Sequence, residues 1–190
     1  MYSKYDPYTL EVNGFTSFLI TVITLALIGI AALIVVNCLR QGFKKCAVDG
    51  LQLFLAATLT GVISMIASWI LGLIFPTLRL SPFIGFLFFL VKFAAGFVAA
   101  GIVMQMIKGY ITGLNLSSTA SKVLSVVVGL LKAYVVLSFI AVVFAFLFHG
   151  PLFYNNTFLI RLNNNSAFDW LPNLIYRILR PVSYATDIGI

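Results

Sequence analysis

Two lysines, Lys92 and Lys132, stand deep inside long apolar stretches of this chain. A lysine at the centre of a lipid bilayer costs about 2.5–3.5 kcal/mol on insertion scales, so such a residue usually has a structural or functional reason. Its ammonium group could reach the lipid headgroups, or bond to backbone carbonyls where a helix is broken. It could also bind an anionic lipid or substrate in a water-filled cavity, or pair with a carboxylate of a partner subunit. The sequence leaves these four explanations open.

Few other residues could do chemistry. No Asp or Glu lies within the apolar stretches. Asp49, just before the second apolar stretch, is the only carboxylate close to the membrane on the side of the first and third connections. The single histidine, His149, stands beside Gly150 and Pro151 at the end of an apolar run. An enzyme would need a nucleophile–base pair, metal ligands or a phosphate-binding loop, and no such spacing is present in the sequence. We therefore expect a protein that is not an enzyme and that uses no metal or cofactor.

The two cysteines, Cys38 and Cys46, lie on either side of a short basic segment. Two thiols without a histidine or carboxylate cluster give no metal-binding signature. If this segment faces the cytoplasm, we expect both thiols to be reduced, because disulfides are rare in that compartment.

The composition places the chain in a membrane. Of its 190 residues, 62% are hydrophobic and 9% are charged, whereas a soluble domain is near half apolar and a quarter charged. Such an excess of apolar residues must use lipid as its solvent. The net charge is +7, but the basic residues are scattered between apolar runs. They therefore indicate topology signals and contacts with anionic lipid headgroups, and not nucleic-acid binding.

The apolar runs predict an all-α integral membrane protein whose four transmembrane helices cover residues of about 15–36, 51–75, 83–107 and 123–148. Each is long enough to cross the roughly 30 Å of hydrocarbon, and the first starts too late and is too long for a cleavable signal peptide. An N-terminal tail, residues 1–14, precedes them. The short connection at 76–82 makes the second and third helices antiparallel neighbours. We expect the third and fourth helices, within 83–148, to face each other as the pair around which the chain is organised.

The C-terminal tail, residues 149–190, has a different composition, with asparagines, aromatic residues and arginines mixed together. Between 169 and 180 the apolar residues follow helical spacing, which predicts an amphipathic helix lying on the membrane surface. A helix packed against the rim of the bundle is an equal alternative. Pro181 ends the helix in either case.

Small residues recur at four-residue spacing in three of the predicted spans. Such stripes let helix backbones approach closely in lipid, so we expect them to mark helix contacts. The candidate packing residues are Gly61, Ser64, Ser68, Gly72, Gly96, Ala100, Ser125, Gly129 and Ala133. Lys92 shares a helical face with Gly96, which predicts that it points toward the closely packed side and not toward bulk lipid.

The segment from 37 to 50 is the densest basic connection in the chain, and it carries Arg40, Lys44 and Lys45 around Gly42. We expect it to be a loop in which Gly42 allows a sharp change of direction. Basic residues are denser on the side of the first and third connections than on the side of the tails. The positive-inside rule therefore predicts that both termini lie outside the cytoplasm.

The order of these features resembles the colicin V production family, which consists of small four-span bacterial inner-membrane proteins. One matching region is the first span followed by Arg40-Gln41-Gly42-Phe43-Lys44, and another is 124–140 with Gly129-Leu130-Leu131-Lys132. The tail is similar too, with Ser166, Trp170 and Pro172. The resemblance implies a role in the export of a peptide toxin or in envelope homeostasis, without catalytic chemistry.

Three functions remain as hypotheses. The first is a non-enzymatic accessory or assembly subunit of the inner membrane, with a protein partner or a second copy of itself and with anionic lipids as partners. The second is a small transporter or channel whose path is lined by Lys92 and Lys132. The third is a structural subunit of a larger membrane complex that has no connection with toxin export.

Overall fold

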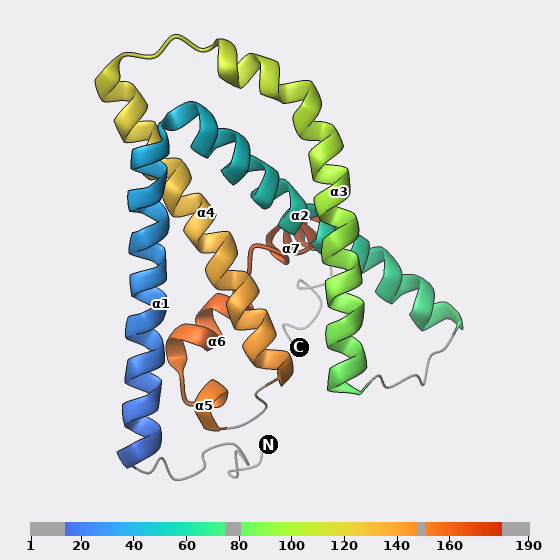
Figure 1. Cartoon of the computed structure of the whole chain (residues 1–190). Helices are drawn as coiled ribbons and strands as arrows, with labels where there is room; N and C mark the ends of the chain where they lie inside the picture. The colour runs from blue at the N-terminus through green and yellow to red at the C-terminus, as the bar shows by residue number, and fades with distance from the viewer. Residues whose placement is uncertain (1–13, 75–80, 148–150, 180–190) are drawn as a thin grey trace, which may run out of the picture.

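The computed structural model describes residues 14–74, 81–147 and 151–179, and all the regular structure within these ranges is helical. The four longest helices are α1 (Gly14–Gln41), α2 (Phe43–Ile74), α3 (Pro82–Gly113) and α4 (Ser118–Leu147). Each is long and apolar enough to cross a membrane. The predicted fold class, an all-α membrane protein with four long apolar helices, is therefore confirmed (Figure 1).

The connection between α1 and α2 is a single residue, Gly42. Its φ of +79° lies in the left-handed region, which glycine adopts without steric cost. The helical ladder nearly continues across it, because Gly42 N donates to Cys38 O and Cys46 N donates to Gly42 O, each at 3.1 Å. The expectation of a basic loop over residues 37–50 was wrong, since only Gly42 departs from helical structure there.

The α2 helix is the centre of the bundle. It packs extensively against α3 and against α4, while α1 packs mainly against α4 (Figure 1). Direct contact between α3 and α4 is small. The expectation that the third and fourth spans form the organising pair was therefore wrong. The reason lies in the small residues: those of α3 face α2, and those of α4 face α1.

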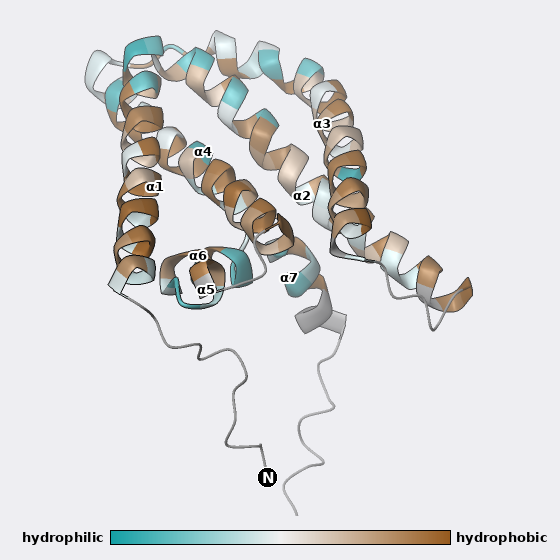
Figure 2. Cartoon of the chain, turned by 60° about the horizontal axis from the view of Figure 1, so that its bottom comes forward, coloured by the Kyte–Doolittle hydropathy of each residue, from teal (hydrophilic) through white to brown (hydrophobic). Residues whose placement is uncertain are grey.

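Figure 2 shows that hydrophilic residues gather at one end of the bundle, where α1 meets α2 and where α3 runs toward α4. The rest of the long helices is mainly apolar. Large apolar side chains of α1 and α3, such as Leu33, Val91 and Met106, are exposed. In helices that span a membrane, these side chains would face lipid or another membrane protein.

After α4 the chain folds back against the bundle. It forms two short helices, α5 (Pro151–Tyr154) and α6 (Thr157–Asn164), then a turn, and then α7 (Trp170–Leu179). We call residues 151–169 the folded-back segment. Figure 1 shows α5 and α6 beside the lower halves of α1 and α4. Phe153 and Leu159 are buried there together with Leu27, which lies at the middle of α1.

The described part of the C-terminal tail is thus an integral part of the bundle. The helix predicted at 169–180 is present as α7, and it packs against α2, as in the second of the two arrangements weighed for it. Sequence periodicity could not choose between them, because both use the same apolar face. Residues 1–13, 75–80, 148–150 and 180–190, including His149 and Pro181, lie outside the described ranges.

Phenylalanines fill the space between α3 and α4. Phe168, from the turn before α7, contacts Phe89 edge-on with ring centroids 5.2 Å apart, and contacts Phe93 at 5.9 Å. Phe139 of α4 completes the group at 5.0 Å from Phe93. Aromatic rings of α3 and α4 therefore meet each other and Phe168 in the space between the two helices.

Candidate functional site

The turn between α6 and α7 is held by side chains from the interior of the long helices. Ala167 N donates to Ser138 Oγ at 3.2 Å, and Trp170 Nε1 donates to Thr58 Oγ1 at 3.0 Å. Tyr134 donates its hydroxyl proton to the carbonyl of Asn165. Non-helical backbone at membrane depth is tolerated only where protein or a wet cavity satisfies it. Ser138 and Tyr134 of α4 thus satisfy two backbone groups of the turn, and Thr58 of α2 holds the indole that follows it.

Gly61 of α2 makes close approach of the turn possible. A β-carbon at this position would lie 1.7 Å from the carbonyl oxygen of Phe168 and 2.9 Å from its carbonyl carbon. Both distances are far below van der Waals contact, so any side chain at residue 61 would displace the turn. Gly61 was predicted to pack against another membrane-spanning helix, and the structure places the folded-back segment there instead.

Asn156 fixes the start of α6. Its side-chain oxygen accepts from Phe158 N and Leu159 N, each at 3.1 Å, and so caps the helix. Its Nδ2 donates to Thr24 Oγ1 of α1 at 3.2 Å, and the residue is only 1% exposed. One buried amide therefore both caps α6 and ties it to the interior of α1.

A cavity of about 440 Å³ opens beside this turn. Its lining is mostly polar and aromatic, and consists of Tyr134, Asn165, Ser166, Trp170, Asn173 and Leu174. Trp170 stacks on Phe54 with centroids 5.6 Å apart, which fixes one wall. Ser166 donates a hydrogen bond to the exposed carboxylate of Asp169. The amides and hydroxyls of the lining can bind water, a cation or a small polar ligand, but they form no nucleophile–base arrangement.

Lys92 lies at the edge of the packed side of α3. Phe89, Gly96 and Ala100 are buried on that side, whereas Val91 beside it is 67% exposed. Lys92 is half-buried, so it points neither into the helix contact nor fully outward. No hydrogen bond or ion pair reaches its ammonium group from any residue that the structure describes.

Lys132 is also half-buried, but it lies at a different helix contact. A β-carbon on Gly50 of α2 would be 3.8 Å from Lys132 Cβ and 2.7 Å from Val128 Cγ1, which places the lysine where α4 crosses α2. Within the described ranges its ammonium group has no hydrogen bond or ion pair either. Neither Lys132 nor Lys92 is among the residues that line the 440 Å³ cavity.

The small residues of α3 and α4 lie at close helix contacts. A β-carbon on Gly96 would be 2.6 Å from Thr60 Oγ1 and 2.8 Å from the carbonyl oxygen of Ala56. One on Gly129 would be 3.1 Å from the Cα of Val35. The neighbours of these glycines in the predicted stripes, Ala100, Ser125 and Ala133, are at most 3% exposed.

The second half of α2 behaves differently. Ser64 is half-buried and Ser68 is exposed, so Ser68 is not packed against another part of this chain, and its role as a packing residue stays a prediction. The C-terminal part of α2 leads away from the other long helices (Figure 1). Large apolar side chains in this part, such as Trp69 and Leu73, are exposed. The surroundings of Gly72 lie outside what the structure describes.

Basic residues mark the opposite end of the bundle from the folded-back segment. Lys44 Nζ donates to the carbonyl of Thr112 at 2.6 Å, in the last turn of α3, where a positive charge is favourable. Arg40, Lys45 and Lys108 are exposed at the same end. The three basic residues predicted to lie on a loop, Arg40, Lys44 and Lys45, are therefore at the ends of α1 and α2, on either side of Gly42.

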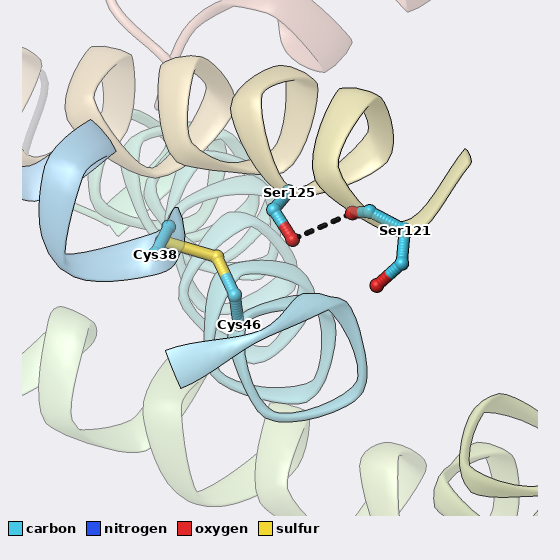
Figure 3. Close-up of a disulfide and its surroundings, with 4 residues drawn as sticks. All are labelled: Cys38, Cys46, Ser121 and Ser125. Atoms are coloured by element: carbon cyan, nitrogen blue, oxygen red, sulfur yellow. Dashed lines mark hydrogen bonds between the residues drawn. A yellow bond between two sulfur atoms is a disulfide. The ribbon is translucent and has the colours of Figure 1, made fainter. Parts of the chain in front are cut away.

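The two cysteines are joined in a disulfide, Cys38–Cys46, with their Cα atoms 5.2 Å apart (Figure 3). Their exposed fractions are 1% and 0%. We expected reduced thiols in a cytoplasmic loop, and the structure instead brings the two residues together because the turn at Gly42 spans a single residue. Figure 3 shows Ser125 of α4 next to the bond, with its hydroxyl donating to the carbonyl of Ser121 at 2.8 Å.

Sequence reasoning missed the polar residues that hold and line the turn. Thr58, Tyr134 and Ser138 lie within predicted apolar spans, and Asn165 and Asn173 lie in the predicted tail, but the sequence patterns single out none of them. One signal in the sequence could have indicated them. The tail combines asparagines with large aromatic residues, and the spans before it carry Ser, Thr and Tyr side chains near their centres. Hydroxyls within a span and amides after it are the groups that a re-entering backbone needs.

No metal site is suggested by the described residues, because no group of three or more His, Cys, Asp or Glu side chains is gathered there. No family model, curated protein or solved structure matches this chain.

Proposed function

We propose that this protein is a non-enzymatic subunit of a bacterial inner-membrane assembly, with an accessory or assembly role in toxin export or envelope homeostasis, as its resemblance to the colicin V production family implies. Such a subunit works by binding partners within the lipid. Its contacts would be made by the exposed helix faces, and anionic headgroups would contact the basic end of the bundle.

The half-buried, unpaired Lys92 is the observation that supports this proposal best. It borders an apolar face of α3 on which Val91, Val98 and Ile102 are each more than 60% exposed. An ammonium group at membrane depth needs a counter-charge, water or a route to the headgroups. A partner helix that covers this face and supplies a carboxylate would meet that need and would bury the apolar side chains as well.

We place the basic end of the bundle in the cytoplasm and both termini outside it. Arg40, Lys44, Lys45, Lys108 and Lys122 all lie near the two connections at that end. Basic residues close to the ends of membrane spans favour the cytoplasmic side. Labelling of single cysteines introduced at 4 and at 116, in a variant lacking Cys38 and Cys46, with an impermeant maleimide in intact cells tests this orientation: reaction at 4 alone is expected.

The test of the subunit proposal is recovery of partners from native membranes in mild detergent. Wild-type protein is expected to elute as a complex with a reproducible protein component, and Lys92→Ala is expected to lose that component. Lys92→Arg should keep it, since the positive charge remains. Lys108→Ala is the matched control, because it removes an exposed lysine from the same helix. Wild-type elution as a bare monomer, with no change in Lys92→Ala, would refute the proposal.

A second candidate function, transport of a small solute or ion, is favoured by the cavity beside the turn. Broken or re-entrant backbone near the middle of a membrane protein commonly accompanies a binding site for an ion or substrate. The route considered from sequence was lined by Lys92 and Lys132, whereas the cavity is lined by residues of α4, the turn and α7.

Flux measurements in liposomes distinguish these routes. Proton and potassium leak across vesicles containing purified protein would be compared for wild type, Tyr134→Phe, Asn173→Ala and the double variant Lys92→Ala/Lys132→Ala. Transport through the cavity predicts loss in the first two variants only, and transport along the lysines predicts loss in the third only. If wild-type vesicles conduct no better than empty ones, transport of these ions is excluded.

A further inference from the structure

The bond between Cys38 and Cys46 spans the single-residue connection at Gly42. One cysteine lies in the last turns of α1 and the other in the first turn of α2, with Gly42 between the two helices. Both side chains are fully buried. The bond therefore closes a small ring of residues around the hinge, by which we mean Gly42 and the helix ends on either side of it.

Beyond this hinge α1 and α2 diverge, as Figure 1 shows. Direct contact between them is small compared with the contacts that α1 makes with α4 and that α2 makes with α3 and α4. The disulfide is consequently a covalent link between helices that pack on different neighbours.

The α4 helix contacts the bond directly. A β-carbon on Gly129 would be 3.3 Å from Cys38 Cβ, and Ser125 lies beside the sulfurs in Figure 3. Movement of Cys38 at the hinge would therefore change the packing of Ser125 and Gly129 of α4 against α1. This contact places the disulfide beside the crossing of α1 and α4.

We propose that Cys38 and Cys46 form a redox-modifiable site that locks and releases the hinge between α1 and α2. The inference rests on the proposed orientation, which puts the hinge in the cytoplasm. Disulfides in that reducing compartment are usually transient and serve catalysis or redox sensing. Gly42 is the residue about which the released helices turn, because its backbone conformation is the least restricted.

The chemistry is thiol–disulfide exchange with a small protein dithiol or its disulfide form. In reduction, one thiolate of the dithiol attacks a sulfur of the pair, forms a mixed disulfide and releases the other cysteine as a thiol. The second thiolate of the dithiol then resolves the mixed disulfide. Two electrons pass to Cys38 and Cys46, two protons are taken up, and the dithiol leaves as its own disulfide. Locking is the same sequence in reverse.

The surroundings suit such an exchange. Arg40 and Lys44 are exposed within two residues of Cys38 and Cys46, and Lys45 adjoins Cys46 directly. Cationic neighbours and a helix N-terminus favour the thiolate over the thiol, and the thiolate is the reacting species. Because the sulfurs are buried in the locked form, the hinge must open slightly before a dithiol can reach them. This requirement makes reduction slower than exchange at an exposed disulfide.

The test uses the full-length protein in its native membranes. Cells are grown with or without a thiol oxidant, and free thiols are trapped with N-ethylmaleimide. The membranes are then made permeable, so that trypsin reaches both sides, and trypsin cuts after Arg40, Lys44 and Lys45. Fragments that separate on a gel only after reduction report the bond. The rate of cutting at these sites reports how open the hinge is.

We expect the bond after oxidant and free thiols without it, reversibly, with cutting several-fold faster in the reduced form. The single variants Cys38→Ser and Cys46→Ser should show the fast rate under both conditions. If a buried serine hydroxyl prevents folding of these variants, the double variant Cys38→Ala/Cys46→Ala replaces them. The rate of cutting at Arg161 shows whether the rest of the protein stays folded. A bond that stays complete, or stays absent, under both conditions overturns the proposal, as does an equal cutting rate in both forms. This experiment does not depend on recovery of a partner protein. If the subunit proposal fails, the result for the disulfide still stands.

Discussion

The two ends of this bundle are held together in different ways. Near the hinge, the helices touch each other directly, with Gly129 of α4 against Val35 of α1 and a disulfide closing the turn. Toward the other end the helices separate, and the folded-back segment fills the space with hydrogen bonds and aromatic rings. Small residues alone can hold helices in lipid only where backbones meet. Where they diverge, another part of the chain must supply both apolar volume and partners for its own backbone.

The largest expected effect comes from a bulky side chain at Gly61, where the folded-back segment packs against α2. Gly61→Leu puts a side chain where even a β-carbon would be 1.7 Å from the Phe168 carbonyl oxygen. The turn must leave its site, and the bonds from Ser138 and Thr58 are lost with it. We expect destabilisation of roughly 3 kcal/mol or more, at the upper end for overpacked sites. Thermal unfolding in detergent measures it, and tryptic cutting at Arg161 should accelerate while cutting at the hinge does not.

The control is Gly29→Ala in α1, where a β-carbon meets nothing within 4 Å. An exposed Gly→Ala change inside a helix should be neutral or stabilising by up to about 1 kcal/mol. If Gly61→Leu unfolds no more readily than this control, the folded-back segment is not seated on α2 as described, and the contrast between the two ends fails.

The contrast also marks what the sequence could predict. Hydropathy and length were enough for four long helices, because burying an unpaired backbone in lipid is too costly for any other arrangement of such runs. The four-residue spacing of small residues pointed to Gly96 and Gly129, and a β-carbon there would lie 2.6 Å and 3.1 Å, respectively, from the nearest atom of a neighbouring helix. These features follow from local sequence and need no knowledge of distant contacts.

The pairing of helices and the position of the tail could not be predicted in the same way. Which helix meets the stripe around Gly96 depends on the complementary surface of α2 at Ala56 and Thr60, about 40 residues away in the chain. The folded-back segment depends on partners as distant as Thr24 for Asn156. Its composition resembles that of an ordinary polar tail, so only the combination of buried amides with hydroxyls inside the spans could have indicated it.

Direct contact at the hinge end is tested by Gly129→Leu. The nearest atom to its β-carbon position is the Cα of Val35, a backbone atom at 3.1 Å that cannot rotate away. We expect α1 and α4 to separate, with a loss of about 1–3 kcal/mol. The change should accelerate tryptic cutting at Arg40 more than cutting at Arg161, which is the reverse of the Gly61→Leu pattern. Equal acceleration at both sites would mean that the two ends unfold as one unit.

A smaller effect is expected from the hydrogen bond that anchors the turn. Ser138→Ala removes the acceptor of Ala167 N, and Ser138 is 0% exposed, so no solvent replaces it. Hydrogen bonds in membrane proteins average about 0.6 kcal/mol and reach about 1.7 kcal/mol. We expect a loss in this range, with faster hydrogen exchange at Ala167. Ser125→Ala is the matched comparison, since that hydroxyl bonds only within its own helix, to Ser121. A larger loss in Ser125→Ala than in Ser138→Ala would contradict the role assigned to the anchor.

The smallest effect is expected at Ser68, on the half of α2 that leaves the bundle. Because Ser68 is exposed, Ser68→Leu should change the stability of the isolated protein by no more than about 0.5 kcal/mol. The same substitution becomes informative in native membranes, where the Ser64–Ser68 stripe is free to receive another helix. Loss of the copurifying component in Ser68→Leu, with unchanged stability of the isolated protein, would place a partner on α2 and not only on the Lys92 face of α3. If the component is retained in Ser68→Leu and lost in Lys92→Ala, the partner binds α3, and the exposed half of α2 faces lipid.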